Sequence, residues 1–196
     1  MAITDGYCTL AELKAVLRIT DVTSDALLEN EIETASRRVD SHCGRFFFQV
    51  AATAIDFYPD TMYRATLPAD LATITSLKTD SAGDGTFATT WAASDYQLQP
   101  TDRALQGRPA RSIQALARTF SWNANGAASI RVTGTWGWSS VPDDVRGATI
   151  LLANRGFARH QAALGVVGSD ETIIQVRASD PDVYDDLRAY VLMGVA

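Results

Sequence analysis

Two histidines are the first side chains to consider for catalysis or metal binding, because imidazole titrates near neutral pH and coordinates metal ions. They are His42 and His160. Neither stands at the spacing of a metal-binding motif or in the context of a catalytic triad. Each is expected near the C-terminal end of a helix, where the helix dipole favours a cation. The sequence therefore predicts a structural role for both.

Paired carboxylates are the second group that could carry acid–base chemistry. The pairs Asp143–Asp144 and Asp185–Asp186 fall near expected helix ends or on an exposed face, which indicates capping or solvation. The sequence also lacks the phosphate-loop, zinc-protease and nucleophile-elbow motifs. We therefore predict a protein that is not an enzyme, with no catalytic residue, no cofactor and no metal ligand.

Arginines form the basic clusters of the chain. Arg103, Arg108 and Arg111 occupy a segment that contains Gly107 and Pro109, which predicts an exposed arm, and Arg37–Arg38 form a second cluster. The arm is either a solvated loop or a contact for an acidic partner surface or DNA. The residues alone leave these alternatives open.

Composition describes an ordinary globular chain of 196 residues, with 46% hydrophobic and 20% charged residues. The net charge of −6 argues against adhesion to nucleic acid, which requires clustered Lys and Arg. No apolar run is long enough for a membrane span, and the first residues do not resemble a signal peptide. A cytoplasmic product is expected, in which Cys8 and Cys43 are packed thiols.

Helical patterns occupy the two ends of the chain. Residues 9–19 begin with the capping box Thr9–Glu12, and residues 25–42 follow Ser24 as the cap and stop at Gly44. A helix from Pro142 to about residue 164 is apolar on nearly all sides, which predicts a central, buried position. A terminal helix begins at Pro181, with an apolar stripe that includes Tyr190.

Short extended runs separated by turn residues fill the middle of the chain. The expected strands are residues 46–50, 54–58, 72–77, 86–91, 96–99, 113–122 and 128–138. The turn at 123–126 predicts a hairpin between the last two. The fold class is therefore α+β: a single domain, 1–196, with a bundle of about four helices (9–45 and 141–196). An antiparallel β lobe (about 46–138) is inserted between its second and central helices.

Aromatic residues are concentrated in this β lobe and raise the possibility of an interface. Strand spacing favours a core position for most of them. They are Tyr58, Tyr63, Trp91, Tyr96, Trp122, Trp136 and Trp138.

The order of these elements resembles the head–tail connector (head completion, or adaptor) proteins of tailed bacteriophages. The similarity rests on TLAELKAVLRI at 9–19, DALLENEIETASRRVDSHCGR at 25–45, YQLQP at 96–100, VTGTWGW at 132–138 and VPDDVRGATILLANRGFAR at 141–159. These motifs cover the helical frame and the strand before the central helix, whereas residues 50–128 match only in style.

The resemblance implies a structural virion protein of the neck, made in the host cytoplasm. Family members form a ring, expected to have twelve subunits, beneath the portal protein. The ring extends the DNA channel and docks a stopper or tail-completion protein, while DNA passes without specific binding. Other readings are a stopper or tail terminator on a related scaffold, a soluble enzyme with an unrecognised site, or a DNA-binding module, for which a basic stripe is missing.

Partner contacts are expected at the arginine arm and in the C-terminal segment. A glycine joint followed by an extended Ile/Val run could become ordered on assembly, although the last helix could equally pack on its own bundle. The candidates are Arg103, Arg108, Arg111, Gly165, Gly168, Ile173, Ile174, Val176, Tyr184 and Tyr190.

Overall fold

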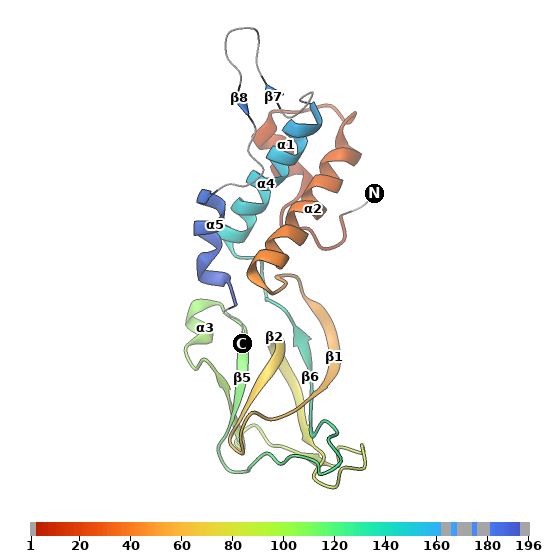
Figure 1. The fold of residues 1–196 in the computed structure, drawn as a ribbon, viewed down its shortest axis with the longest axis vertical. Coiled ribbons are helices and arrows are strands. Elements are labelled where there is room, and N and C mark those ends of the chain that lie inside the picture. The colour runs from red at the N-terminus through yellow and green to blue at the C-terminus, as the bar shows by residue number, and fades with distance from the viewer. Residues whose placement is uncertain (1–2, 162–165, 168–173, 176–180, 193–196) are drawn as a thin grey trace. The chain divides into compact units, whose positions relative to one another are not determined.

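The computed structural model describes residues 3–161, 166–167, 174–175 and 181–192, and it confirms the α+β class. The chain divides into two compact units, a helical unit (1–48 with 141–196) and a β unit (49–140). The helical unit contains α1 (Leu10–Leu17), α2 (Asp25–Cys43), α4 (Asp143–Gln161), α5 (Pro181–Leu187), the 3-10 helix η2 (Arg188–Tyr190) and the short antiparallel pair β7 (Val166–Val167) and β8 (Ile174–Gln175) (Figure 1).

The ends of the first two helices follow from local chemistry. Thr9 and Glu12 form the predicted capping box: the Thr9 amide donates to Glu12 Oε2 at 2.7 Å, and the Glu12 amide donates to Thr9 Oγ1 at 3.2 Å. Gly44 ends α2 with φ +66°, a conformation that favours glycine. Ser24 stands at the N-cap of α2, but its side chain makes no capping hydrogen bond.

Helix α4 is the centre of the helical unit, because α1, α2 and α5 all contact it. Ala148, Leu152 and Phe157 are buried on the sides that these helices cover. The expectation of burial all round is wrong on one side, since Leu151 is 43% exposed. An apolar circumference does not by itself supply a neighbour for every face. Pro142 precedes the helix instead of starting it, and its carbonyl accepts from the Arg146 amide at 3.0 Å.

The β unit is a fully antiparallel six-stranded sheet with the order β1-β6-β2-β5-β4, in which β3 also pairs with β2. Its elements are β1 (Val50–Phe57), β2 (Arg64–Thr79), β3 (Thr89–Thr90), β4 (Tyr96–Gln99), α3 (Arg103–Gln106), β5 (Ala110–Ala115) and β6 (Ile130–Trp136). The core includes Leu71, Leu77, Ile113, Ile130, Val132 and Trp136.

The bounds of three predicted strands and the predicted hairpin are wrong. Residues 46–48 are not a strand, because Phe47 is buried in the helical unit, where its amide donates to the Tyr7 hydroxyl. The predicted strand 113–122 ends at Ala115. No hairpin joins it to β6, because β2 lies between β5 and β6 in the sheet. The predicted strand 72–77 is only the later part of β2, which begins at Arg64 and includes Pro68.

A close approach of backbones fixes the centre of the sheet. Gly134 of β6 pairs with Thr53 of β1 on one side and Ile74 of β2 on the other. A Cβ atom at Gly134 would lie 2.2 Å from the carbonyl oxygen of Thr73. Only glycine therefore fits at this position of the sheet.

Candidate interaction surfaces

The predicted arginine arm is divided by the structure. Arg111 lies in β5, where its Nη1 is 3.1 Å from Oδ1 of the buried Asp70. Arg108 is exposed and Arg103 is half-buried in and after the short helix α3, beside Leu105, which is 92% exposed. Arg103 and Arg108 therefore remain available at a surface, whereas Arg111 is engaged in an internal ion pair.

The C-terminal candidates fall partly beyond what can be described. Gly165, Gly168, Ile173 and Val176 lie outside the described residues. Ile174 belongs to β8, whose backbone pairs with β7. The binding of partners by this segment stays a prediction.

The two candidate tyrosines pack within the helical unit. The Tyr184 ring of α5 lies 4.5 Å from the His42 ring of α2. The Tyr190 hydroxyl donates to Asp144 Oδ2 at 3.0 Å, and its ring meets Phe47 edge-on at 5.8 Å. These contacts hold the last helix against its own bundle, which the sequence left as an alternative.

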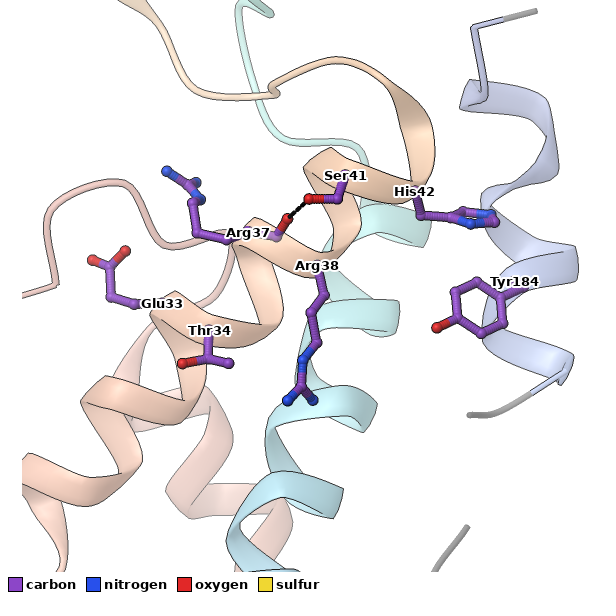
Figure 2. Close-up of a pocket in the computed structure, with 7 residues that line it drawn as sticks. All are labelled: Glu33, Thr34, Arg37, Arg38, Ser41, His42 and Tyr184. Atoms are coloured by element: carbon purple, nitrogen blue, oxygen red, sulfur yellow. Dashed lines mark hydrogen bonds between the residues drawn. The ribbon is translucent and has the colours of Figure 1, made fainter. Parts of the chain in front are cut away.

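An open groove of about 660 Å³ lies along α2 and α5 (Figure 2). Its lining residues are Glu33, Thr34, Arg37, Arg38, Ser41, His42 and Tyr184. Figure 2 shows that all but Tyr184 come from α2, that the His42 ring points toward α5, and that the Tyr184 ring points from α5 back toward α2. Helical spacing of four residues brings Thr34, Arg38 and His42 onto one side of α2.

The charges of this groove differ in how they are held. Arg37 is fixed: its Nη2 donates to the Asp5 carbonyl at 2.9 Å, and its Nε lies 3.0 Å from Asp40 Oδ2. Glu33 Oε1 accepts from the Thr4 and Asp5 amides. Arg38 is exposed and makes no ion pair within the described part of the chain. The groove therefore presents an exposed guanidinium, that of Arg38, in addition to the His42–Tyr184 ring pair.

A segment that the sequence analysis missed closes the other side of α2. The Tyr7 amide donates to Ser36 Oγ at 3.1 Å, and the Tyr7 hydroxyl donates to Asp40 while accepting from the Phe47 amide at 2.8 Å. Burial raises the pKa of Tyr7, and the bond to Asp40 raises it further. Burial also raises the pKa of Asp40. The only feature of this segment in the sequence is a tyrosine close to the N-terminus. A single tyrosine does not predict contacts with residues 40 and 47.

The second histidine has a partner that the sequence did not reveal. His160 stands in the last turn of α4 as expected, but its Nε2 lies 2.9 Å from Oε1 of Glu31 on α2. Glu31 is 6% exposed. Because the two residues are 129 positions apart, no local pattern connects them.

Reactive groups are few among the described residues. Cys8 and Cys43 are free, buried thiols, and burial raises their pKa to about 12 and about 11. Such thiols are poor nucleophiles near neutral pH. No cluster of three or more His, Cys, Asp or Glu side chains in the described chain could hold a metal ion.

The aromatic residues of the β unit separate into two groups. Trp91, Trp136 and Trp138 are buried, whereas Tyr58, Tyr63 and Trp122 are each more than half exposed. Met62 and Leu116 are at least half exposed as well. Hydrogen bonds join their two loops, from Trp122 Nε1 to the Pro59 carbonyl at 3.1 Å and from the Phe120 amide to the Met62 carbonyl at 2.8 Å. Tyr58 and Trp122 were expected inside strands 54–58 and 113–122, so the sequence pattern did not indicate their exposure; both lie beyond the observed strand ends at Phe57 and Ala115.

The whole fold is similar to chains of gene transfer agent (GTA) particles. The chain matches one in the neck of an empty GTA particle with C6 symmetry (TM-score 0.59) and one in the neck of a native particle with C12 symmetry (TM-score 0.58). Both are 22% identical, and the matches cover 100% of this chain and 95% and 94% of those chains. This chain therefore shares its fold with chains from the necks of GTA particles. A chain in the virion of a native GTA particle matches with a TM-score of 0.55 and the same identity.

Two further observations complete this comparison. No protein-family model matches the sequence, and no curated protein matches it. Within the described residues, no helix has both the length and the hydrophobicity to cross a membrane.

Proposed function

We propose that this chain is a head–tail connector, or adaptor, subunit of a phage-like particle. It is a structural, non-enzymatic protein of the virion neck, made in the host cytoplasm, and its two units act together as one connector domain. The observation that carries the proposal is the fold match, which extends over the entire chain and nearly all of a chain from the neck of a GTA particle.

The proposed assembly is a homo-oligomeric ring of twelve subunits beneath the portal protein. The C6 and C12 symmetries of the GTA necks support a ring, because each cyclic axis repeats every subunit around one channel. The net charge of −6 suits a channel wall that DNA must pass without adhesion.

The ring would dock a stopper or tail-completion protein on the side away from the portal. The aromatic surface formed by Tyr58, Met62, Tyr63, Leu116 and Trp122 supports protein contact, because exposed Tyr, Trp and Met are enriched at interfaces. Arg103 and Arg108 supply positive charge for an acidic partner surface. Binding by the C-terminal segment would add a further contact.

The test is the mass of the purified chain in solution, measured by light scattering after size exclusion, alone and mixed with the portal protein of the same particle. We expect a species near twelve times the 21.2 kDa chain, either alone or on the portal. Formation only on mixing would mean that the portal templates the ring. A chain that stays monomeric and does not bind the portal would overturn the adaptor role and favour a stopper or tail terminator.

A further inference from the structure

The two end strands of the order β1-β6-β2-β5-β4 each have one side that no other described strand covers. Strand β1 pairs only with β6, and strand β4 pairs only with β5. The outer side of each edge strand therefore carries a row of backbone N–H and C=O groups that no described strand pairs with. Such a row of groups is a template for another strand.

Neither edge strand contains a lysine or a proline, two residues that protect natural sheet edges. Residues 49–55 contain no charged residue or proline, and residues 50–54 are exposed. Strand β4, with the sequence YQLQ, is also uncharged. The one acidic residue of β1, Asp56, is bound by Arg131 through two contacts of 2.6 and 2.7 Å. The protective features that are present are the shortness of β4, with four residues, and a register irregularity between Val50 and Thr53 of β1; residues 54–57 of β1 pair regularly with β6.

The directions of the two edge strands agree with a repeat. Every neighbouring pair from β1 to β4 is antiparallel, so β1, β2 and β4 run in the same direction. A second copy placed beside the first in the same orientation brings its β1 next to the free side of β4. The small rotation of a twelve-fold axis preserves strand direction, so this contact is a parallel pair.

We propose that β4 of one copy pairs with β1 of the next and joins the β units into a closed ring. The proposal rests on the proposed function, which requires a cyclic assembly. A ring needs two different, complementary surfaces on each subunit, and the two edges of one sheet meet that requirement. A second copy is favoured over a foreign strand because every subunit supplies both edges in equal number.

Cross-linking between two introduced cysteines tests this contact. Ala54 pairs with Thr133, and Gln97 pairs with Gln114. Both are exposed on the face opposite the core. The double variant Ala54→Cys/Gln97→Cys, assembled alone or on the portal, is treated with a short bis-maleimide. The native thiols Cys8 and Cys43 are buried with raised pKa values and do not compete.

We expect a covalent ladder of dimers, trimers and larger species on a denaturing gel. The matched control Ala54→Cys/Leu105→Cys should give no ladder, because Leu105 is exposed on α3 and lies on neither edge strand. A ring that forms at full mass but gives no ladder in the Ala54→Cys/Gln97→Cys variant would overturn the edge contact and leave the connector function intact.

A charge on the edge provides a second readout that does not depend on cross-linking. Ala54→Lys should raise the protein concentration needed for ring formation by about tenfold or more, with an unchanged circular dichroism spectrum. Leu105→Lys adds the same charge elsewhere and should leave assembly unchanged. Equal assembly of both variants would overturn the inference, and a wild-type chain that stays monomeric with portal would overturn both proposals.

Discussion

The helical unit and the β unit use different side chains to join separate segments of the chain by hydrogen bonds. In the helical unit, Tyr7 ties the N-terminal segment to α2 and to Phe47 through its amide and hydroxyl. In the β unit, carboxylates serve instead: Asp80 accepts from the amides of Ala82, Gly83 and Gly85, and Asp70 accepts from Arg111 and Trp138. The comparison shows that a tyrosine hydroxyl joins separate segments in one unit, whereas two carboxylates accept the bonds in the other; the buried carboxylate of the helical unit, Glu31, pairs with His160 between two helices.

The two units can be followed separately in solution. All four tryptophans, Trp91, Trp122, Trp136 and Trp138, lie in the β unit. Tryptophan fluorescence therefore reports on the β unit, while far-ultraviolet circular dichroism is dominated by the helices. Urea unfolding followed by both signals separates their free energies of unfolding.

The largest effect is expected for Asp70→Ala in the β unit. Asp70 is 3% exposed, and its Oδ2 accepts from Trp138 Nε1 at 3.0 Å while Oδ1 pairs with Arg111. Removing the carboxylate takes away the acceptor that Trp138 and Arg111 share. The free energy of unfolding should fall by about 3–5 kcal/mol. The fluorescence midpoint in urea should fall, and the circular dichroism midpoint should move less.

A matched control separates buried from exposed carboxylates. Asp185→Ala removes an exposed carboxylate of α5 and should change stability by about 0.5 kcal/mol or less. Equal effects of the Asp70 and Asp185 variants would contradict the role assigned to the buried charge.

A smaller effect is expected for Tyr7→Phe in the helical unit. The change keeps the ring but removes the hydroxyl that accepts from the Phe47 amide and donates to Asp40. An unsatisfied buried amide costs about 1–3 kcal/mol. The circular dichroism midpoint should fall while the fluorescence midpoint changes little. Tyr63→Phe, at a half-exposed tyrosine of the β unit, should alter neither, and a loss as large as that of Tyr7→Phe would argue against the hydroxyl's role.

Local chemistry explains which parts of the fold could be predicted. The capping box at Thr9, the stop at Gly44 and the strand before Pro142 depend on residues a few positions apart, and the structure agrees with each of them. The hairpin at 123–126 failed because the pairing of β6 is decided by β2, more than fifty residues earlier in the chain. Turn residues indicate a reversal of the chain but do not identify its neighbour in the sheet.

The interaction surfaces were less predictable than the fold for the same reason. The segment around Arg111 has the composition of an exposed arm, yet Arg111 pairs with Asp70, 41 positions earlier. The groove beside Arg38 needs Tyr184 from a helix far along the chain. The exposure of Tyr58 and Trp122 follows from loops that are adjacent only after the sheet has formed.

The smallest effect concerns the start of the helical unit and depends on pH. The Thr9 backbone amide donates to the Glu12 carboxylate, and with the Thr9 hydroxyl it holds the pKa of Glu12 below its ordinary value of 4.5. A carboxyl whose pKa is lower in the folded state stabilises the fold above its unfolded pKa. That stabilisation is lost as the pH falls through the lowered value. Glu12→Gln should therefore be less stable than the wild type at pH 7, and the difference should shrink as the pH falls below 4.5. Because Thr9 and Glu12 lie in the helical unit and all tryptophans lie in the β unit, the circular dichroism signal should show this change and tryptophan fluorescence should not. A difference that stays constant from pH 7 to below the lowered pKa would mean that the charge of Glu12 contributes nothing to the cap.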